Sequence, residues 1–208
     1  MPLVSKTNFN NCILYLWKIE ESEKKLKEGI KIYNSLRKRL SIMKTEKHRK
    51  GILAVHQLLK LAKIPENNLL YDSKGAPYLK SKKFISISHT KYFAGIVIGE
   101  FPIGLDIEAC HNKILNIGQK FLNPNESYAI GNIEESTYIW TSKEAIYKAL
   151  RIPGINFSKQ IRLKSPYIRG EKAEALAIIE NKIKLFKIIS FDVDSHFITI
   201  ALENKLVS

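Results

Sequence analysis

The stretch Ile103-Gly104-Leu105-Asp106-Ile107-Glu108 alternates branched apolar residues with one glycine and two acids. Side chains alternate between the two faces of a β-strand, so this period predicts a strand whose Gly104, Asp106 and Glu108 share one face. Hard cations such as Mg²⁺ bind carboxylate oxygens and usually take one or two carboxylates from the protein. An isolated Asp-x-Glu is also common on an ordinary acidic strand face, so the pair by itself leaves both interpretations open.

Strands and helices are predicted on both sides of this stretch. Phe84–Ile87 and Phe93–Ile98 are rich in β-formers and are separated by a polar turn, which predicts a hairpin. Apolar residues at helical spacing predict an amphipathic helix over Ile42–Ala62, and a second helix is expected over Thr137–Leu150. Alternation after residue 161 indicates a final meander. We therefore expect an α+β fold of two similar units, with domains 1–102 and 103–208.

The second predicted helix carries a polar stripe. Trp140, Glu144 and Lys148 follow one another at i, i+4 spacing and so share one side of the helix. An exposed Glu–Lys pair of this kind usually only stabilises its helix, by about 0.2–0.5 kcal/mol. Here Lys143 lies next to Glu144, and Ala145 permits close packing. The stripe is therefore expected to face protein or ligand, where a third carboxylate and ammonium groups suit a metal and a phosphate together.

The charge of the chain narrows its partners. Its 208 residues include 34 Lys and Arg against 20 Asp and Glu, a net charge of +14. Residues 18–63 alone carry fourteen of these basic residues and five Glu, a net charge of +9. Such a field attracts phosphate, acidic protein or anionic membrane.

Cys12 and Cys110 are too few for a disulfide framework or a cysteine-built zinc site. With neither a signal peptide nor a membrane-length apolar run predicted, we expect a soluble cytoplasmic protein.

Three segments resemble, in order, the motifs of the surfactin-type 4′-phosphopantetheinyl transferases: Phe84–Thr90, Ile103–Glu108 and Trp140–Ala149. The resemblance implies two pseudo-symmetric α/β half-domains with coenzyme A in the cleft between them. It also implies Mg²⁺-dependent transfer of 4′-phosphopantetheine from coenzyme A to a serine of an apo acyl or peptidyl carrier protein. Adenosine 3′,5′-bisphosphate would be released.

The resemblance implies roles for residues in the second half of the chain. Asp106, Glu108 and Glu144 match the family's metal-binding carboxylates, and Glu144 also matches its proposed general base. Lys143 and Lys148 match positions associated with phosphate contacts and charge stabilisation. We therefore expect Glu144 and Lys148 to be catalytic.

The nucleotide end of coenzyme A is expected to meet residues in the first half. Ser88 and His89 match the family's Ser-His turn, and Arg49 and Lys50 fall where it places basic phosphate ligands. Two departures bear on coenzyme A affinity. The family usually has Gly-Lys-Pro where residues 75–77 read Gly-Ala-Pro, so Lys74 would have to replace the missing lysine, and His56 replaces a common Arg.

The implied partner is an acidic carrier protein, in a monomeric enzyme with no membrane association. The sequence leaves open whether fatty-acid, polyketide or peptide assembly is served. A Mg²⁺-dependent nuclease or a basic nucleic-acid-binding protein is the alternative, because clustered carboxylates, a helix-borne lysine and a net charge of +14 also suit a phosphodiester.

Overall fold

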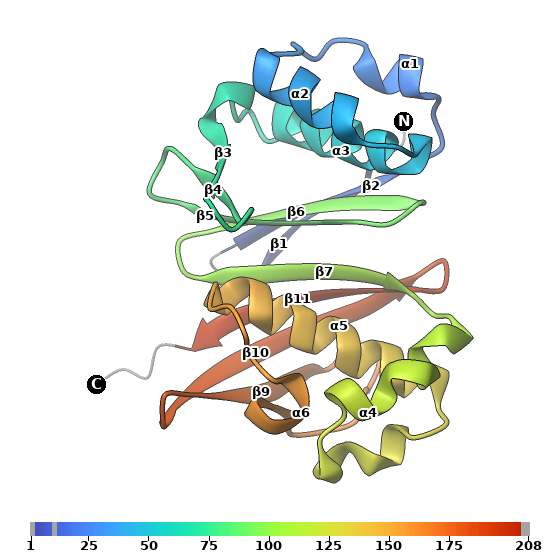
Figure 1. Cartoon of the computed structure of the whole chain (residues 1–208), viewed down its shortest axis with the longest axis vertical. Helices are drawn as coiled ribbons and strands as arrows, with labels where there is room; N and C mark the ends of the chain where they lie inside the picture. The colour runs from blue at the N-terminus through green and yellow to red at the C-terminus, as the bar shows by residue number, and fades with distance from the viewer. Residues whose placement is uncertain (1–2, 10–11, 205–208) are drawn as a thin grey trace. The chain divides into compact units, whose positions relative to one another are not determined.

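The computed structural model describes residues 3–9 and 12–204, and the chain divides into two compact units, Met1–Glu100 and Phe101–Ser208 (Figure 1). The first unit thus ends at Glu100, where the sequence predicts a domain boundary at residue 102. Each unit combines helices with an antiparallel sheet. The predicted α+β fold class is confirmed.

The first unit is built on a four-stranded antiparallel sheet in the order β1-β2-β6-β5. These strands are β1 (Leu3–Phe9), β2 (Cys12–Lys18), β5 (Phe84–His89) and β6 (Phe93–Gly99), and β5 and β6 form the predicted hairpin. Helix α3 packs on β2, β5 and β6 through its apolar face. The other elements are α1 (Glu23–Lys27), α2 (Asn34–Ile42), α3 (Glu46–Leu61), η1 (Glu66–Asn68), β3 (Leu69–Tyr71) and β4 (Pro77–Leu79).

The second unit is built on a five-stranded antiparallel sheet in the order β7-β11-β10-β9-β8. Its strands are β7 (Ile103–Ala109), β8 (Ile161–Leu163), β9 (Lys172–Ile179), β10 (Lys182–Val193) and β11 (His196–Asn204). Its helices are η2 (Asn112–Ile117), α4 (Gly118–Phe121), η3 (Pro124–Ala129), α5 (Ile133–Leu150) and α6 (Phe157–Gln160). Helix α5 packs across β7 and β11.

Helix α5 begins at Ile133, four residues before the predicted start at Thr137. Asn132 caps it, because its side-chain oxygen accepts a hydrogen bond from the Glu135 backbone N–H. Glu135 also places negative charge in the first turn, where it complements the helix dipole. Arg151 ends the helix in a left-handed conformation, with φ of 56°. The periodicity located the buried part of the helix but not its cap.

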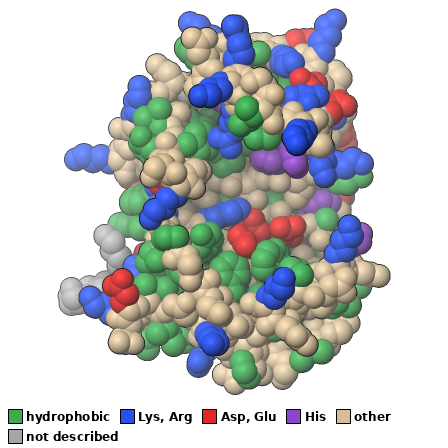
Figure 2. Space-filling view, in the orientation of Figure 1, with side chains coloured by type: hydrophobic (Ala, Val, Ile, Leu, Met, Phe, Trp, Pro, Cys, Tyr) green, Lys and Arg blue, Asp and Glu red, His purple; other side chains and the backbone are tan. Residues whose placement is uncertain are grey.

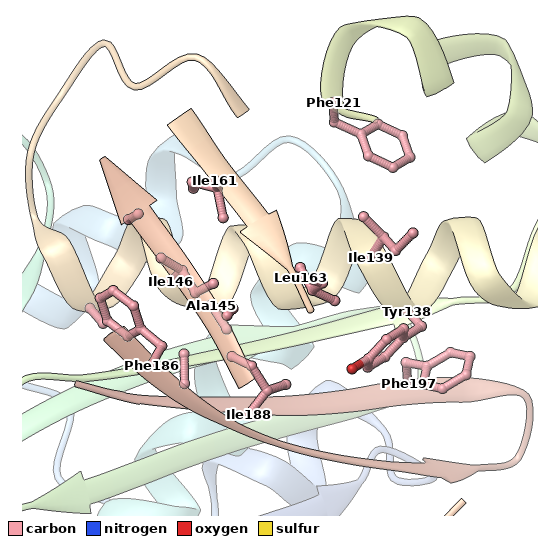
Figure 3. Packing of buried hydrophobic residues seen from close by; sticks show 14 of the residues in the cluster. Phe121, Tyr138, Ile139, Ala145, Ile146, Ile161, Leu163, Phe186, Ile188 and Phe197 are labelled. Carbon is pink, nitrogen blue, oxygen red and sulfur yellow. The ribbon is translucent and has the colours of Figure 1, made fainter. Parts of the chain in front are cut away.

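The second unit has an apolar core between α5 and the sheet (Figure 3). Tyr138, Ile146, Phe186 and Phe197 are among its fully buried side chains. The backbones of α5 and β7 approach each other at Gly104. A Cβ atom placed on Gly104 would lie 1.7 Å from the Ala145 carbonyl oxygen, so only glycine fits there. This close approach brings the acidic face of β7 directly against α5.

Candidate functional site

Strand β7 holds two of the predicted site carboxylates. Asp106 and Glu108 point to the same side of the strand as Gly104, which is the side that faces α5. Asp106 is 4% exposed, and Glu108 is half-buried. Figure 2 shows acidic side chains gathered in a patch over the second unit, where Figure 1 places β7 and α5.

Helix α5 brings its polar stripe to these carboxylates. The Trp140 indole N–H donates to Glu108 Oε1 at 3.4 Å, and the Lys148 ammonium donates to Asp106 Oδ1 at 2.5 Å. Lys148 Nζ also donates to the Leu105 carbonyl oxygen at 3.1 Å. The stripe predicted from i, i+4 spacing therefore faces β7. Its hydrogen bonds connect α5 to the two acids of the strand.

Burial and neighbouring charges raise the pKa of Glu108 and Glu144. Burial, and after it the neighbouring Asp106, raises the pKa of Glu144 to about 7 against the opposing effect of Lys148. Burial and Asp106 also raise the pKa of Glu108, while the Trp140 N–H and Lys148 lower it. The pKa shifts of Glu108 and Glu144 place both carboxyls within electrostatic range of Asp106. Glu144 therefore exchanges its proton near neutral pH, where a general acid or base is most effective.

The donor set suits a hard cation. Three carboxylates that repel one another on one side of β7 and α5 would be neutralised by a divalent ion, which prefers oxygen ligands. Within residues 3–9 and 12–204, no group of three or more His, Cys, Asp or Glu side chains is already arranged to hold a metal. In this arrangement Lys148 supplies the positive charge next to Asp106.

Lys143 does not lie where a phosphate could reach it. Its side chain is fully buried, and its ammonium donates to Glu126 Oε2 at 2.6 Å and to the Phe121 carbonyl oxygen at 2.7 Å. A third bond reaches the Phe157 carbonyl oxygen at 3.2 Å. Successive helical residues point about 100° apart, so Lys143 enters the core while Glu144 faces β7. The expected phosphate contact of Lys143 is therefore corrected to a buried ion pair.

In the first unit, the predicted Ser-His turn lies against α3. Ser88 is buried and His89 half-buried at the end of β5. A Cβ atom on Gly51 would lie 2.6 Å from His89 Nδ1, so the imidazole rests on the helix surface that Gly51 leaves open. Lys50 immediately precedes Gly51 and is half-buried. The structure thus puts His89 next to the helical turn that carries Lys50.

The other predicted nucleotide ligands are placed differently. The Arg49 guanidinium donates to Glu23 Oε2 at 2.9 Å and to the Met43 carbonyl oxygen at 3.0 Å, so a phosphate would compete with both. Lys74 lies in an exposed turn, where Asp72 Oδ1 accepts from the backbone N–H groups of Lys74 and Ala76. Burial lowers the pKa of His56 to about 4, so this imidazole is neutral and does not replace an Arg as a cation.

The sequence did not identify the ion-pair partner of Glu126, which is Lys143. Asn123 and Glu126 form a capping box at the start of the 3-10 helix η3. Glu126 is fully buried, and its Oε1 accepts from the Leu163 backbone N–H at 2.9 Å. The capping signal was visible in the sequence, whereas the ion pair with Lys143 depends on packing between segments 17 residues apart.

Comparison with known proteins shows what the second half of the chain is similar to. Residues 102–201 match the sequence model of the 4′-phosphopantetheinyl transferase superfamily. The 4′-phosphopantetheinyl transferase gsp of Aneurinibacillus migulanus is 26% identical over an alignment of 101 residues, and the match covers 45% of this chain and 43% of that protein. The matched region thus spans less than half the length of the curated relative. These findings confirm the predicted resemblance, and the family match contains the motifs at Ile103–Glu108 and Trp140–Ala149.

No helix within residues 3–9 and 12–204 is long and apolar enough to cross a membrane.

Proposed function

We propose that this protein transfers the 4′-phosphopantetheine group of coenzyme A to a serine of an acyl or peptidyl carrier protein. The observation that carries the proposal is the convergence of Asp106, Glu108, Glu144 and Lys148 within the region that matches the superfamily. We also propose Lys50, Ser88 and His89 as ligands of the nucleotide end of coenzyme A, whereas Arg49 and Lys74 stay predictions. The two cysteines are free, which suits a reducing cytoplasm.

The chemistry that these residues supply is proton transfer and charge stabilisation. The carrier serine hydroxyl attacks the β-phosphorus of coenzyme A, and Glu144 accepts its proton, since its pKa of about 7 suits a base at neutral pH. A new bond joins the serine oxygen to phosphorus. The bond from phosphorus to the bridging oxygen breaks, and adenosine 3′,5′-bisphosphate leaves. The Lys148 ammonium stabilises negative charge on the phosphoryl oxygens.

We propose Asp106, Glu108 and Glu144 as the residues that would hold Mg²⁺. When bound, the ion supplies charge neutralisation on the pyrophosphate of coenzyme A. In this structure Lys148 pairs with Asp106 at 2.5 Å, and its side chain is more exposed than that of Asp106.

The test is a transfer assay with purified protein, coenzyme A, Mg²⁺ and several apo carrier proteins. Mass spectrometry is expected to show that one carrier gains the mass of one phosphopantetheine group and that omission of Mg²⁺ prevents the gain. Absence of transfer to every carrier, together with absence of coenzyme A binding in calorimetry, would refute the proposal. Metal-dependent cleavage of DNA or RNA that is lost on substitution of Asp106 would instead favour the nuclease alternative.

A further inference from the structure

The second unit contains a buried ion pair outside the carboxylate cluster. Lys143 and Glu126 are both fully buried, and their charged atoms are 2.6 Å apart. Burial of two charges is unfavourable unless their remaining hydrogen-bonding positions are satisfied. The Lys143 ammonium and the Glu126 carboxylate both have these additional hydrogen bonds. The pair is therefore a buried, fully hydrogen-bonded ion pair.

The lysine connects α5 to three other segments. Its three N–H groups are matched by three acceptors: Glu126 Oε2, the Phe121 carbonyl oxygen at 2.7 Å and the Phe157 carbonyl oxygen at 3.2 Å. Phe121 ends α4, and Phe157 begins α6. One ammonium group therefore ties the middle of α5 to the ends of two short helices.

The glutamate extends these connections. Glu126 Oε2 also accepts from the Asn123 backbone N–H at 2.8 Å, and Oε1 accepts from the Leu163 backbone N–H on β8. The Asn123 side chain donates to the Ser158 carbonyl oxygen at 2.7 Å. The ion pair therefore fixes α5 relative to η3, α6 and β8 on the side of the helix away from β7.

The opposite side of α5 is fixed by its contact with β7. The Gly104–Ala145 backbone approach leaves no room for a Cβ atom, so α5 cannot move closer to the strand there. Glu144 lies between these two restraints, immediately after Lys143 and immediately before Ala145. A shift of α5 along or away from β7 would move the Glu144 carboxylate relative to Asp106.

We propose that the Glu126–Lys143 ion pair is a positioning device that holds Glu144 in register with the carboxylates of β7 for phosphopantetheine transfer. This inference rests on the proposed function. Lys143 is thus a positioning residue, with no phosphate contact of its own. Misplacement of a catalytic group by about 1 Å can cost about 100-fold in rate, so loss of the pair should lower kcat even in a folded protein.

The test uses a double substitution that removes both charges and keeps side-chain length, Glu126→Gln with Lys143→Met. Removal of both charges avoids the uncompensated buried charge that either truncation alone would leave. We expect a folded protein with kcat lower by about 10- to 100-fold and with KM for coenzyme A within about twofold of the original value. The matched control is Lys184→Met with Glu203→Gln, which removes a 2.7 Å ion pair between β10 and β11 and should leave both constants unchanged.

A crystal structure of the double variant separates failure of this inference from failure of the proposed function. Displacement of the Glu144 carboxylate by about 1 Å or more supports the positioning role, as does the selective loss of kcat. A folded variant with Glu144 in place, or with unchanged kcat, overturns it. If the original protein transfers no phosphopantetheine, the proposed function fails. The positioning role of the ion pair is then tested only by comparing the position of the Glu144 carboxylate in the two crystal structures. If the double variant does not fold, Glu126→Asp, which keeps both charges but shortens the acid, serves for the same measurements.

Discussion

The two units share a plan but differ in what their main helices bury. In the first unit, α3 presents an apolar face to its sheet, with Leu53, Leu58 and Leu59 fully buried. In the second unit, α5 buries Lys143 in an ion pair and holds Glu144 near a buried Asp106. The same helix-on-sheet architecture thus serves as an ordinary core in one unit and as a candidate catalytic site in the other. The difference lies in the face of β7 that carries Gly104, Asp106 and Glu108. The α5 backbone packs closely on Gly104, while polar side chains of α5 meet the two acids.

The largest expected effect is the loss of transfer on changing the acidic face of β7. Asp106→Asn keeps the shape of the side chain but removes the charge that pairs with Lys148 and acts on Glu144. We expect transfer to fall at least about 100-fold, as measured by mass spectrometry of the carrier, while circular dichroism stays unchanged. Glu174→Gln removes an exposed carboxylate from β9 and should leave transfer intact. Near-normal turnover of Asp106→Asn would remove this residue from the mechanism.

A second effect compares a glycine in each unit. Gly104→Ala places a Cβ against the Ala145 carbonyl, a backbone atom that cannot rotate away, so we expect a loss of about 3 kcal/mol in the free energy of unfolding. Gly51→Ala meets the His89 ring, which is a side chain and can move, and alanine also favours the helix by about 1 kcal/mol. Urea denaturation should therefore show a large loss for Gly104→Ala and little change for Gly51→Ala. Equal losses would contradict this account of the α5–β7 contact.

A third effect concerns the pH dependence of stability. The pKa of Glu144 is raised from 4.5 to about 7 in the folded protein, so the folded state binds more protons than the unfolded state between these values. This carboxyl therefore destabilises the folded protein progressively as pH rises through that window. Glu144→Gln should be more stable than the original protein by about 1–2 kcal/mol at about pH 8, a figure reduced for partial exposure, and equally stable at about pH 4.

Thermal denaturation without divalent cations measures this difference. Glu174→Gln is the control, because Lys164 lowers the pKa of this exposed carboxyl, so its removal should not stabilise the folded protein at high pH. A stability difference for Glu144→Gln that does not change with pH would show that the carboxyl is not perturbed as described.

The smallest expected effect tests whether the basic charge of the first unit steers an acidic carrier. Arg37 and Lys38 are exposed on α2, and changing both to Gln should lower kcat/KM for the carrier by about two- to fivefold at low salt. The difference should vanish at about 0.5 M salt, where charges are screened beyond a few ångströms. Lys113→Gln with Lys120→Gln makes the same charge change in the second unit. An equal effect of this control would contradict a dominant role for residues 18–63.

Much of the fold could be predicted because its signals are local. The β5–β6 hairpin, the strand at Ile103–Glu108 and the buried part of α5 each follow from periodicity within a few residues. The start of α5 was placed too late, because its first turn is defined by the Asn132 cap and not by apolar spacing. The helix that follows Asn123 is short because Glu126 leaves the helical conformation there, at φ of −105° and ψ of 19°, while its side chain bonds to other segments.

The sequence by itself determined the order of the motifs, the shared face of Gly104, Asp106 and Glu108, and the stripe that carries Glu144 and Lys148, because side-chain direction within one strand or helix is fixed by backbone geometry. Only the tertiary structure decided which lysine faces the carboxylates. Lys143 and Lys148 are both basic residues of one helix, and their sequence spacing does not say which side of that helix becomes core. Because α5 packs against β7 on one side, Lys148 pairs with Asp106 in the candidate site. On the other side Lys143 pairs with Glu126 in the interior.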